Sequence, residues 1–462
     1  MAEINSHMFR EYDIRGIAGE DLNPREAELI GKAFGTYCQK AGEKTVLVAR
    51  DARLSSPSLC ASLINGITST GLNVVDIGLA SHGLFLFALR YLQVSTGGYV
   101  TASHNPAQHN GFKFVLNYGY FGGKQNTELC DAIKKEKFTN AEKQNGKVST
   151  ASVLEKYCEF LKSKVKIENK IGNKKLKVVV DCGNGMASIA APRVLSELGC
   201  EVVELYCEVD CSFPNHPADP VVPENLRDLQ AAVKAHSADF GIAFDGDGDR
   251  IVAVDEKGEI VWADQLAAIF AKHILLQNKN AKIVFDVNCS LALPEVIKQH
   301  GGVPVASKIG HTNIERLMRT EGALMGAELS GHIFLEENNG VDDAVYAACK
   351  LVEIVSRTSG SFSSLLSDYP RYYPTPQIRV PMADDKKFAF IAQIVQEFKN
   401  EGNNVLDIDG AKVIFEDGWG ILRASNTAAQ LTMRFEGKTP QATERIKKLF
   451  FDKLKQHGVE VK

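Results

Sequence analysis

The sequence predicts an α/β fold of three similar βαβ-based domains with mixed, mostly parallel sheets, followed by a smaller α+β domain. The first observation is a pattern that occurs three times: a β-branched run ending in aspartate, a helical stretch, and a second strand introduced by glycine. The second is length, because 462 residues are too many for one hydrophobic core. The third is a change of pattern after residue 368, where prolines indicate an extended connector.

The repeated strands predict where ligands bind. The first strands are expected at 45–51, 177–181 and 282–286, and the second strands at 71–75, 199–203 and 302–305. Strands that alternate with helices form parallel sheets with right-handed crossovers. Ligands of such sheets lie beyond the carboxyl ends of the strands. We therefore expect the chemistry in three loops that follow later strands, 101–106, 245–250 and 326–332.

Four domains follow from this pattern. We place them at residues 1–148, 149–256, 257–368 and 369–462. The fourth domain departs from the repeat, because it has a helix at 385–399, short strands over 405–415 and a last helix at 440–457. This order is typical of an α+β domain.

Composition excludes several classes of function. The formal net charge is -4, which provides no basic field for a nucleic acid or an anionic membrane. The longest apolar runs are too short for a membrane helix, and the N-terminus lacks the pattern of a signal peptide. The 10 cysteines are scattered in a large chain and are typical of reduced, packed thiols. We expect a cytoplasmic protein.

The strongest local signal is Asp245-Gly246-Asp247-Gly248-Asp249-Arg250. Three carboxylates at alternate positions, separated by glycines, can direct their oxygens to one hard cation. An acidic turn is the alternative interpretation. A calcium EF-hand loop fits less well, because Arg250 occupies the position that requires glycine. Phosphate chemistry usually employs magnesium, so we predict one Mg²⁺ held by Asp245, Asp247 and Asp249.

Ser103 is the candidate nucleophile. It follows a strand, and we expect its hydroxyl to be exposed on the loop Thr101-Ala102-Ser103-His104-Asn105-Pro106. Serine in such a loop is often only a turn or cap residue. A neighbouring His104 and the nearby Lys113 favour a nucleophile, because they offer a proton acceptor and a cation. A G-x-S-x-G elbow is absent, which argues against an acyl-transfer hydrolase.

Two further loops carry groups that suit a sugar phosphate. Glu328, Ser330 and His332 stand at alternate positions and can offer hydrogen bonds to hydroxyl groups, although a plain polar loop is equally compatible with them. The segment at 308–312 could add positive charge beside them. In the last domain, Arg423-Ala424-Ser425-Asn426-Thr427 combines a guanidinium with hydroxyls, which is a weak signal for phosphate binding.

Together these motifs resemble the α-D-phosphohexomutase family, and within it the bacterial phosphomannomutase/phosphoglucomutase group. The segment Phe9-Arg10-Glu11-Tyr12-Asp13-Ile14-Arg15-Gly16 is similar to the opening of that group. The four loops described above resemble its phosphoserine, metal, sugar-recognition and phosphate-binding loops, in the same order along essentially the whole chain.

The resemblance implies four domains around a central cleft and an intramolecular phosphotransferase that interconverts hexose 1-phosphate and hexose 6-phosphate. Ser103 would be a phosphoserine and a ligand of Mg²⁺, and a hexose 1,6-bisphosphate would be the intermediate and activator. The catalytic set would be Ser103, His104, Lys113 and Arg250, with His104 and Lys113 as candidates for proton transfer. The substrate-binding set would be Tyr12, Arg15, Lys308, Gly310, His311, Glu328, Ser330, His332, Arg423, Ser425, Asn426 and Thr427.

The remaining expectations concern specificity and partners. Mannose and glucose phosphates are the expected substrates, but Asn288 stands where the family leads us to expect a lysine, and Lys308 could compensate. A phosphoglucosamine mutase and a magnesium-dependent sugar phosphatase are the alternatives. We expect small-molecule hexose phosphates as partners, no nucleic acid or membrane, and a monomer or homodimer.

Overall fold

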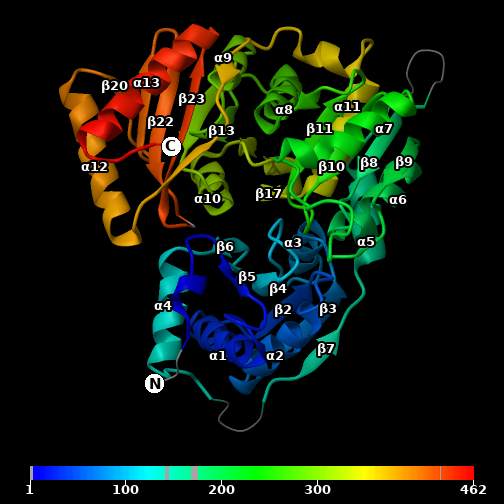
Figure 1. Ribbon diagram of the computed structural model, residues 1–462. Helices are drawn as coiled ribbons and strands as arrows, with labels where there is room; N and C mark the ends of the chain where they lie inside the picture. Colours follow the sequence, from blue (N-terminus) through cyan, green and yellow to red (C-terminus); the bar gives the residue numbers. More distant parts are fainter. Residues whose placement is uncertain (1–3, 141–144, 168–174, 427, 462) are drawn as a thin grey trace. The chain divides into compact units, whose positions relative to one another are not determined.

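The computed structural model describes residues 4–140, 145–167, 175–426 and 428–461. The chain divides into two compact units: the first contains Met1–Leu266 and Ser330–Ser367, and the second contains Ala267–Leu329 and Asp368–Lys462. Strands and helices alternate along the first three quarters of the chain (Figure 1). The predicted class, mixed sheets covered by helices and then a smaller α+β part, is confirmed.

The first unit opens with a seven-stranded mixed sheet. Its strands are β1 (Ile14–Ile17), β2 (Thr45–Arg50), β3 (Asn73–Leu79), β4 (Gly97–Val100), β5 (His109–Leu116), β6 (Gly119–Phe121) and β7 (Val148–Thr150). Strand β2 pairs in parallel with β3 and β4, whereas β5 runs antiparallel to β1, β4 and β6. The helices of this part are η1 (Ser6–Met8), α1 (Pro24–Lys40), α2 (Ser56–Ser69), α3 (His82–Tyr91) and α4 (Lys124–Lys134).

Helices α1 and α2 lie unusually close to each other. A Cβ atom on Gly31 of α1 would lie 2.4 Å from the carbonyl oxygen of Leu63, and one on Gly66 of α2 would lie 2.2 Å from that of Glu28. Glycine at both positions therefore permits the contact. The buried faces of α1, α2 and α4 form one core with the sheet, in which the rings of Phe34 and Phe114 stack 4.0 Å apart.

A second sheet of the first unit has the order β12-β11-β10-β8-β9. Its strands are β8 (Lys177–Asp181), β9 (Glu201–Leu205), β10 (Phe240–Phe244), β11 (Ile251–Asp255) and β12 (Ile260–Val261). Strands β9, β8 and β10 are parallel, and every residue of β10 and β11 is buried. The helices are α5 (Leu154–Ser163), η2 (Met186–Ile189), α6 (Ala191–Glu197), η3 (Pro223–Leu226) and α7 (Arg227–Ala235).

The first unit also includes a hairpin and a buried helix from later in the chain. Strands β16 (Ile333–Leu335) and β17 (Val341–Asp342) are antiparallel and flank η4 (Glu336–Asn338). All residues of α11 (Ala344–Ser356) are buried, and the side chain of Asp343 caps its N-terminus by accepting from the backbone N–H of Tyr346. The short helix η5 (Phe362–Leu366) follows.

The second unit combines one α/β repeat with the α+β end of the chain. Strands β13 (Lys282–Asp286), β14 (Val303–Ser307) and β15 (Met325–Ala327) are parallel and are accompanied by α9 (Ala292–Gln299) and α10 (His311–Glu321). Helix α8 (Ala263–Gln277) spans the division between the units. The last part contains β18 (Tyr373–Pro374), β19 (Ile378–Pro381), α12 (Asp384–Asn400), β20 (Asn404–Leu406), β21 (Ala411–Phe415), β22 (Gly418–Ala424), β23 (Gln430–Gly437) and α13 (Pro440–Gln456).

The predicted strands correspond closely to the structure. The runs at 177–181 and 282–286 coincide with β8 and β13, and the run at 45–51 ends one residue beyond β2. The sequence did not predict the antiparallel return strands β5 and β11, which place Lys113 beside Tyr99 of β4 and Ile251 beside Phe244 of β10. These return strands carry part of the candidate site.

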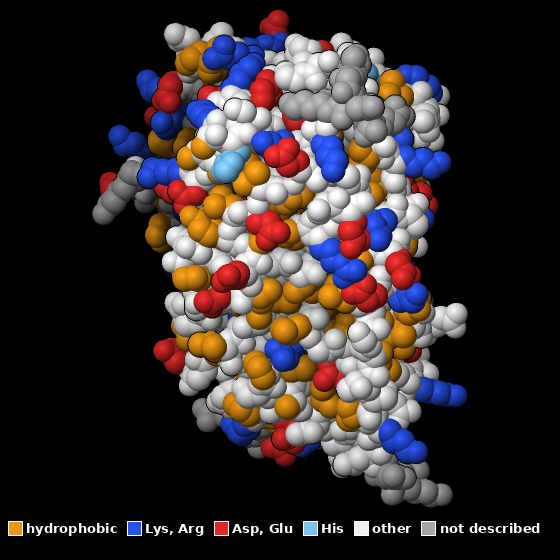
Figure 2. All heavy atoms as spheres, turned by 90° about the vertical axis from the view of Figure 1, so that its right-hand side faces the viewer, with side chains coloured by type: hydrophobic (Ala, Val, Ile, Leu, Met, Phe, Trp, Pro, Cys, Tyr) orange, Lys and Arg blue, Asp and Glu red, His pale blue; other side chains and the backbone are white. Residues whose placement is uncertain are grey.

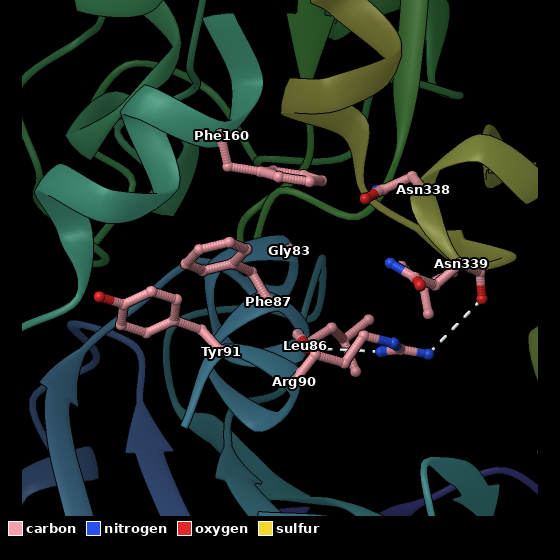
Figure 3. A pocket seen from close by; sticks show the side chains of 9 residues that line it. Gly83, Leu86, Phe87, Arg90, Tyr91, Phe160, Asn338 and Asn339 are labelled. Atoms are coloured by element: carbon pink, nitrogen blue, oxygen red, sulfur yellow. Dashed lines mark hydrogen bonds between the residues drawn. The ribbon is translucent and has the colours of Figure 1, made fainter. Parts of the chain in front are cut away.

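The surface and its hollows give little indication of the site. Lys, Arg, Asp and Glu side chains are interspersed on the face shown in Figure 2, in keeping with a net charge of -4. A cavity of about 260 Å³ in the first unit is lined by Gly83, Leu86, Phe87, Arg90 and Tyr91 of α3, together with Phe160, Asn338, Asn339 and Val341 (Figure 3). Its lining includes none of the predicted site residues.

In the described parts of the chain, the helices are all too short or too polar to cross a bilayer.

Candidate active site

Two strand ends of the first unit bring the predicted nucleophile to the predicted metal loop. Strand β4 ends at Val100 and β10 ends at Phe244, and each continues into one of the predicted loops. The hydroxyl of Ser103 donates a hydrogen bond of 2.7 Å to Oδ2 of Asp245. A Cβ atom on Gly246 would lie 2.4 Å from the carbonyl oxygen of Ser103, so the two loops pack backbone to backbone.

Ser103 has a constrained environment. Its φ is 51°, in the left-handed region that few residues other than glycine adopt, and its relative exposure is 1%. The prediction of an exposed hydroxyl was wrong, because the metal loop covers it. Strained backbone of this kind is frequent at functional sites, where the surrounding structure has to maintain it.

Arg53 maintains the conformation of the loop at 101–106 that carries Ser103. The sequence did not identify Arg53 as a functional residue. Its guanidinium is 1% exposed and donates to four backbone oxygens, those of Ser103, Asn105, Pro106 and His109, at 2.7 to 3.0 Å. Its Nε–H donates to Asp51 at 3.1 Å. The planar fork of arginine suits such a set of acceptors. The available signal was the spacing Asp51-Ala52-Arg53 at the end of a buried strand.

The three aspartates of the metal loop fit a divalent cation. Asp245, Asp247 and Asp249 are at most 1% exposed, and each offers an oxygen within 4.8 Å of the others. Oδ1 of Asp247 and Oδ1 of Asp249 are buried and have no hydrogen-bond partner among the described residues. Burial and the charges of Asp249 and Asp247 raise the pKa of Asp245 well above its usual value. A hard cation would satisfy both oxygens and relieve this repulsion.

Asp245 also shapes the loop that carries it. Its Oδ1 accepts from the backbone N–H groups of Gly248 and Asp249 at 3.0 Å and of Arg250 at 3.2 Å. These bonds fold the loop around the carboxylate, and Gly248 has a φ of 76° that favours glycine. One oxygen of Asp245 therefore serves the loop, and the other faces Ser103.

Lys113 supplies a permanent positive charge at this loop. Its Nζ lies 2.8 Å from Asp247 Oδ2 and 2.5 Å from Asp249 Oδ2. Burial would lower the pKa of Lys113, but the two carboxylates outweigh burial and raise it. The ammonium group is consequently a poor proton donor or acceptor near neutral pH.

His104 has the opposite protonation behaviour. Its Nδ1 lies 3.1 Å from the hydroxyl oxygen of Ser103. Burial, together with the charges of Arg250 and Arg15, holds the pKa of His104 well below its usual value. The ring is therefore neutral near pH 7 and can accept a proton from an oxygen beside it.

Arginine side chains from two further segments reach the same loops. Arg15 on β1 donates to Asp13 and to Asn105 Oδ1, both at 2.7 Å. Arg250 follows the metal loop, and its Nε lies 4.0 Å from Asp245 Oδ2 and 3.9 Å from Asp249 Oδ1. The half-buried Tyr12 lies three residues before Arg15 in the same opening segment. Guanidinium groups so placed can bind a transferring phosphoryl group.

His332, predicted as a substrate ligand, contacts Arg250. Its Nε2 accepts from Arg250 Nε at 3.0 Å, and its Nδ1 lies 2.8 Å from Oδ2 of Asp342. Burial opposes a proton on the ring, but Asp249 and Asp342 raise the pKa of His332. The charge of Arg250 works against this rise, and its hydrogen bond requires a lone pair on Nε2, so the geometry places the ring proton on Nδ1, toward Asp342. The half-buried Ser330 precedes it in the first unit.

The predicted sugar-recognition residues of the second unit lie around β15 and α10. Glu328 is buried, and its Oε1 accepts from the backbone N–H of Gly310 at 2.5 Å. His311 begins α10 and is buried, whereas Lys308 is exposed. The backbone of Asn288 donates to Asp286 at 2.5 Å and accepts from Arg434 at 2.9 Å.

The predicted phosphate-binding loop follows β22 in the same unit. Arg423 is buried and forms an ion pair with Asp409 at 3.2 Å, and its Nε has no hydrogen-bond partner among the described residues. The hydroxyl oxygen of Ser425 accepts from the backbone N–H of Ala428 at 3.2 Å, and Asn426 is half-buried. Asp409 also accepts from the backbone N–H of Ile309 at 3.1 Å, which joins this loop to the 308–312 segment. Thr427 lies outside the described residues.

Comparison with known proteins identifies the family. Four family models match consecutive parts of the chain: phosphoglucomutase/phosphomannomutase alpha/beta/alpha domain I at residues 6–140, domain II at 155–258, domain III at 262–373, and the C-terminal domain at 378–453. The chain belongs to the phosphoglucomutase/phosphomannomutase family. This result confirms the predicted class, a hexose phosphate mutase and therefore an isomerase.

Individual relatives agree over nearly the whole length. A phosphomannomutase/phosphoglucomutase of Pseudomonas putida is 41% identical over 454 residues, covering 98% of this chain and 96% of the relative. A phosphoglucomutase of Neisseria gonorrhoeae is 37% identical over 453 residues, with 97% of each chain covered. The crystal structure of a phosphoglucomutase/phosphomannomutase family protein from Burkholderia thailandensis has a TM-score of 0.91 and 34% identity, covering 99% of this chain and 100% of that chain.

Proposed function

We propose that this chain interconverts the 1-phosphates and 6-phosphates of mannose and glucose, with Ser103 as the phosphorylated residue and a hexose 1,6-bisphosphate as the intermediate. The hydrogen bond between Ser103 and Asp245 is the observation that carries the proposal, because it joins a candidate nucleophile to a candidate cation site. Mannose and glucose are suggested by the names of relatives that are 37 to 41% identical over nearly the whole chain.

Two transfers produce the isomerisation. In the first, a sugar hydroxyl oxygen attacks the phosphorus of phosphoserine, the bond from Ser103 Oγ to phosphorus breaks, and the hydroxyl proton goes to a base. In the second, Ser103 Oγ attacks the other phosphate of the bisphosphate and the product hydroxyl regains a proton. Nδ1 of His104, 3.1 Å from Ser103 Oγ and neutral near pH 7, is the proposed carrier of this proton.

The charged residues have separate roles in this scheme. Lys113 remains an ammonium group and, with Arg15 and Arg250, stabilises the charge that develops on the transferring phosphoryl oxygens. Asp245, Asp247, Asp249 and the phosphorylated Ser103 would hold one Mg²⁺. When bound, that ion neutralises phosphate charge and aligns the reacting oxygens.

Recognition of the sugar phosphate is assigned to residues of the second unit and to Ser330 of the first unit. Glu328 and Ser330 are proposed to bind sugar hydroxyls, together with Lys308, Gly310 and His311. Arg423, Ser425, Asn426 and Thr427 are proposed to bind the phosphate that does not react. A buried guanidinium nitrogen of Arg423 lacks a partner among the described residues, which supports an anionic ligand there.

The setting of the enzyme is also a proposal. All ten cysteines, each within the described ranges, are free thiols, which supports a reducing compartment such as the cytoplasm. We propose a monomer or homodimer acting on small-molecule hexose phosphates. The domain limits at 148, 256 and 368 also stay predictions.

The intact mass of the purified protein tests the central claim. After incubation with glucose 1,6-bisphosphate, the wild type should carry one phosphoryl group and Ser103→Ala none. Ser58→Ala is the matched control, because Ser58 is exposed on α2 and should leave phosphorylation and turnover unchanged. Wild-type protein without a phosphoryl group would overturn the proposal, and release of free phosphate in place of an isomer would indicate a phosphatase. Assays with the 1-phosphates of mannose, glucose and glucosamine establish the sugar.

The cation site has a test that is independent of turnover. Millimolar Mg²⁺ should raise the thermal unfolding temperature of the wild type, because an ion that binds the folded state stabilises it. Asp247→Asn should reduce this shift, since it removes one of the three carboxylates. An equal shift in the variant would show that the ion binds elsewhere.

A further inference from the structure

One buried carboxylate beside the candidate active site, that of Asp342, lies outside the three-aspartate loop and outside the predicted phosphate-binding loop. Asp342 ends β17 and is 0% exposed. Its Oδ2 lies 2.8 Å from Nδ1 of His332. Its Oδ1 accepts from the hydroxyl of Tyr120 and lies 3.4 Å from Nε2 of His82. Burial alone would raise the pKa of Asp342, but the two histidines hold it below its usual range.

Two partners of Asp342 come from a strand and a helix of the first unit. Tyr120 lies on β6, and His82 is the first residue of α3 and is 1% exposed. The rings of these two residues stack with their centroids 5.9 Å apart, and Nε2 of His82 lies 3.0 Å from the hydroxyl of Tyr120. The carboxylate is thus fixed on one side by two rings, and its other oxygen faces His332.

His332 transmits this arrangement to Arg250. A proton on Nδ1 that is donated to Asp342 leaves a lone pair on Nε2, and that lone pair accepts from Arg250 Nε at 3.0 Å. The backbones of Arg250 and His332 form an antiparallel bridge, with the N–H of Ile251 donating to Gly331 at 3.0 Å. The backbone therefore sets the position of Arg250, and the imidazole sets the direction of its side chain.

We propose that Asp342 is a positioning residue for phosphoryl transfer, because it holds Nε2 of His332 as an acceptor and thereby fixes the guanidinium of Arg250 beside the metal loop. This inference rests on the proposed function. With the proton on Nε2, the ring would direct an N–H at the N–H of Arg250, and the guanidinium would turn away. A carboxylate behind a histidine is a common means of fixing the tautomer.

The substitution Asp342→Asn tests the proposal, since it preserves size and removes the charge. We expect kcat for a hexose 1-phosphate to fall roughly 10- to 100-fold, with KM within about threefold, because the loss affects a group that stabilises the transition state. Asp343→Asn is the matched control. Asp343 is the adjacent buried carboxylate, but it accepts from Tyr157 and caps α11, so its variant should lower thermal stability and leave kcat within about threefold.

A double-mutant cycle separates positioning from a general effect on the fold. In a His332→Gln background, the further change Asp342→Asn should alter kcat by less than about twofold, because Asp342 acts through His332. An undiminished effect in that background would overturn the proposal. If Asp342→Asn lowers the fraction of folded protein, Tyr120→Phe takes its place: it retains the carboxylate, removes one donor to Oδ1 and should lower kcat by several-fold at constant KM.

The outcomes distinguish this inference from the proposed function. Wild-type protein that fails to acquire a phosphoryl group from glucose 1,6-bisphosphate would overturn the proposed function itself. Wild-type protein that is phosphorylated and turns over, with Asp342→Asn and Tyr120→Phe both unchanged in kcat, would overturn only the role of Asp342.

Discussion

Two lysines, one in each unit, are both buried and differ in what surrounds them. Lys113 of the first unit is 5% exposed and lies between the carboxylates of Asp247 and Asp249. Lys412 of the second unit is 3% exposed and donates to the carbonyl oxygens of Val287 at 2.7 Å and Cys289 at 3.4 Å. Its Nζ also lies 3.8 Å from the centre of the Trp419 ring.

The pKa values of the two lysines shift in opposite directions. Burial would lower both, and at Lys113 the two carboxylates reverse that effect. At Lys412, burial prevails and lowers the pKa to about 8. The neutral partners of Lys412 hold its position without compensating fully for its charge. The first unit therefore has a permanent charge at its candidate cation site, whereas the second uses a lysine to hold two parts of its fold together.

Removing the permanent charge should have the largest effect on activity. Lys113→Met deletes the ammonium group that faces Asp247 and Asp249, and we expect kcat to fall roughly 10²- to 10³-fold. Steady-state assays with a hexose 1-phosphate measure this loss. Lys124→Met is the control, because that side chain is 89% exposed on α4 and should change kcat by less than about twofold. A Lys113→Met enzyme within tenfold of the wild type would contradict the comparison.

Arg53 is a third buried cation, and most of its hydrogen-bond partners are backbone carbonyl groups. Arg53→Lys keeps the charge but has too few donors for the four carbonyl groups and Asp51. We expect kcat to fall about 100-fold, because Ser103 would be displaced. Each carbonyl group left without a donor should also lower the free energy of unfolding by about 1–3 kcal/mol. Activity and thermal unfolding are measured together. Arg50→Lys, which affects a half-buried arginine of the same segment, should be nearly neutral.

In the second unit, a cation that is proposed to bind the non-reacting phosphate should affect binding more than turnover. Arg423 forms an ion pair with Asp409, and its Nε has no partner among the described residues. Arg423→Lys should raise KM about tenfold, through loss of one or two charge-assisted hydrogen bonds, with kcat within about threefold. Initial rates over a range of hexose phosphate concentrations distinguish the two parameters. A fall in kcat at constant KM would place Arg423 in the transition state instead.

Local sequence patterns predicted the strands well, and two of the loops that they singled out lie together in the structure. The strands that end at Asp181 and Asp286 could be predicted, because parallel strands buried on both faces are continuously apolar. The three-aspartate loop stood out as a candidate cation site, because alternating aspartate and glycine residues have few other structural explanations. The resemblance to a known family supplied the proposed roles of the separate loops, which spacing alone could not have assigned.

Residues that act through long-range contacts could not be predicted. Arg53 lies 50 residues before Ser103, and Tyr120 lies 222 residues before Asp342. Such contacts depend on how strands are ordered in the sheets. The antiparallel strand β5 was also missed, and with it the position of Lys113 opposite Tyr99. Burial of Ser103 depends on the packing of two loops 142 residues apart.

The last prediction involves the smallest effect on activity. It concerns how the free energy of unfolding of the second unit depends on pH, and it is the sharpest test of the comparison between the two lysines. Unfolded lysine has a pKa near 10.4, whereas the pKa of Lys412 is about 8 in the folded chain. Between these values the unfolded state binds more protons, so the free energy of unfolding should rise as pH increases from 8 to about 10, by roughly 2–3 kcal/mol. Well below pH 8 both states are charged and Lys412 contributes no slope. Lys412→Met should remove the rise.

Trp419 provides a local probe of this effect, because Lys412 lies over its ring. Denaturant unfolding followed by tryptophan fluorescence, in a Trp262→Phe background, reports on this site at each pH. Lys113→Met serves as the comparison. The pKa of Lys113 is raised, so its loss should leave the slope between pH 8 and 10 unchanged. A slope that persists in Lys412→Met, or disappears in Lys113→Met, would show that the two buried lysines do not differ as their partners imply.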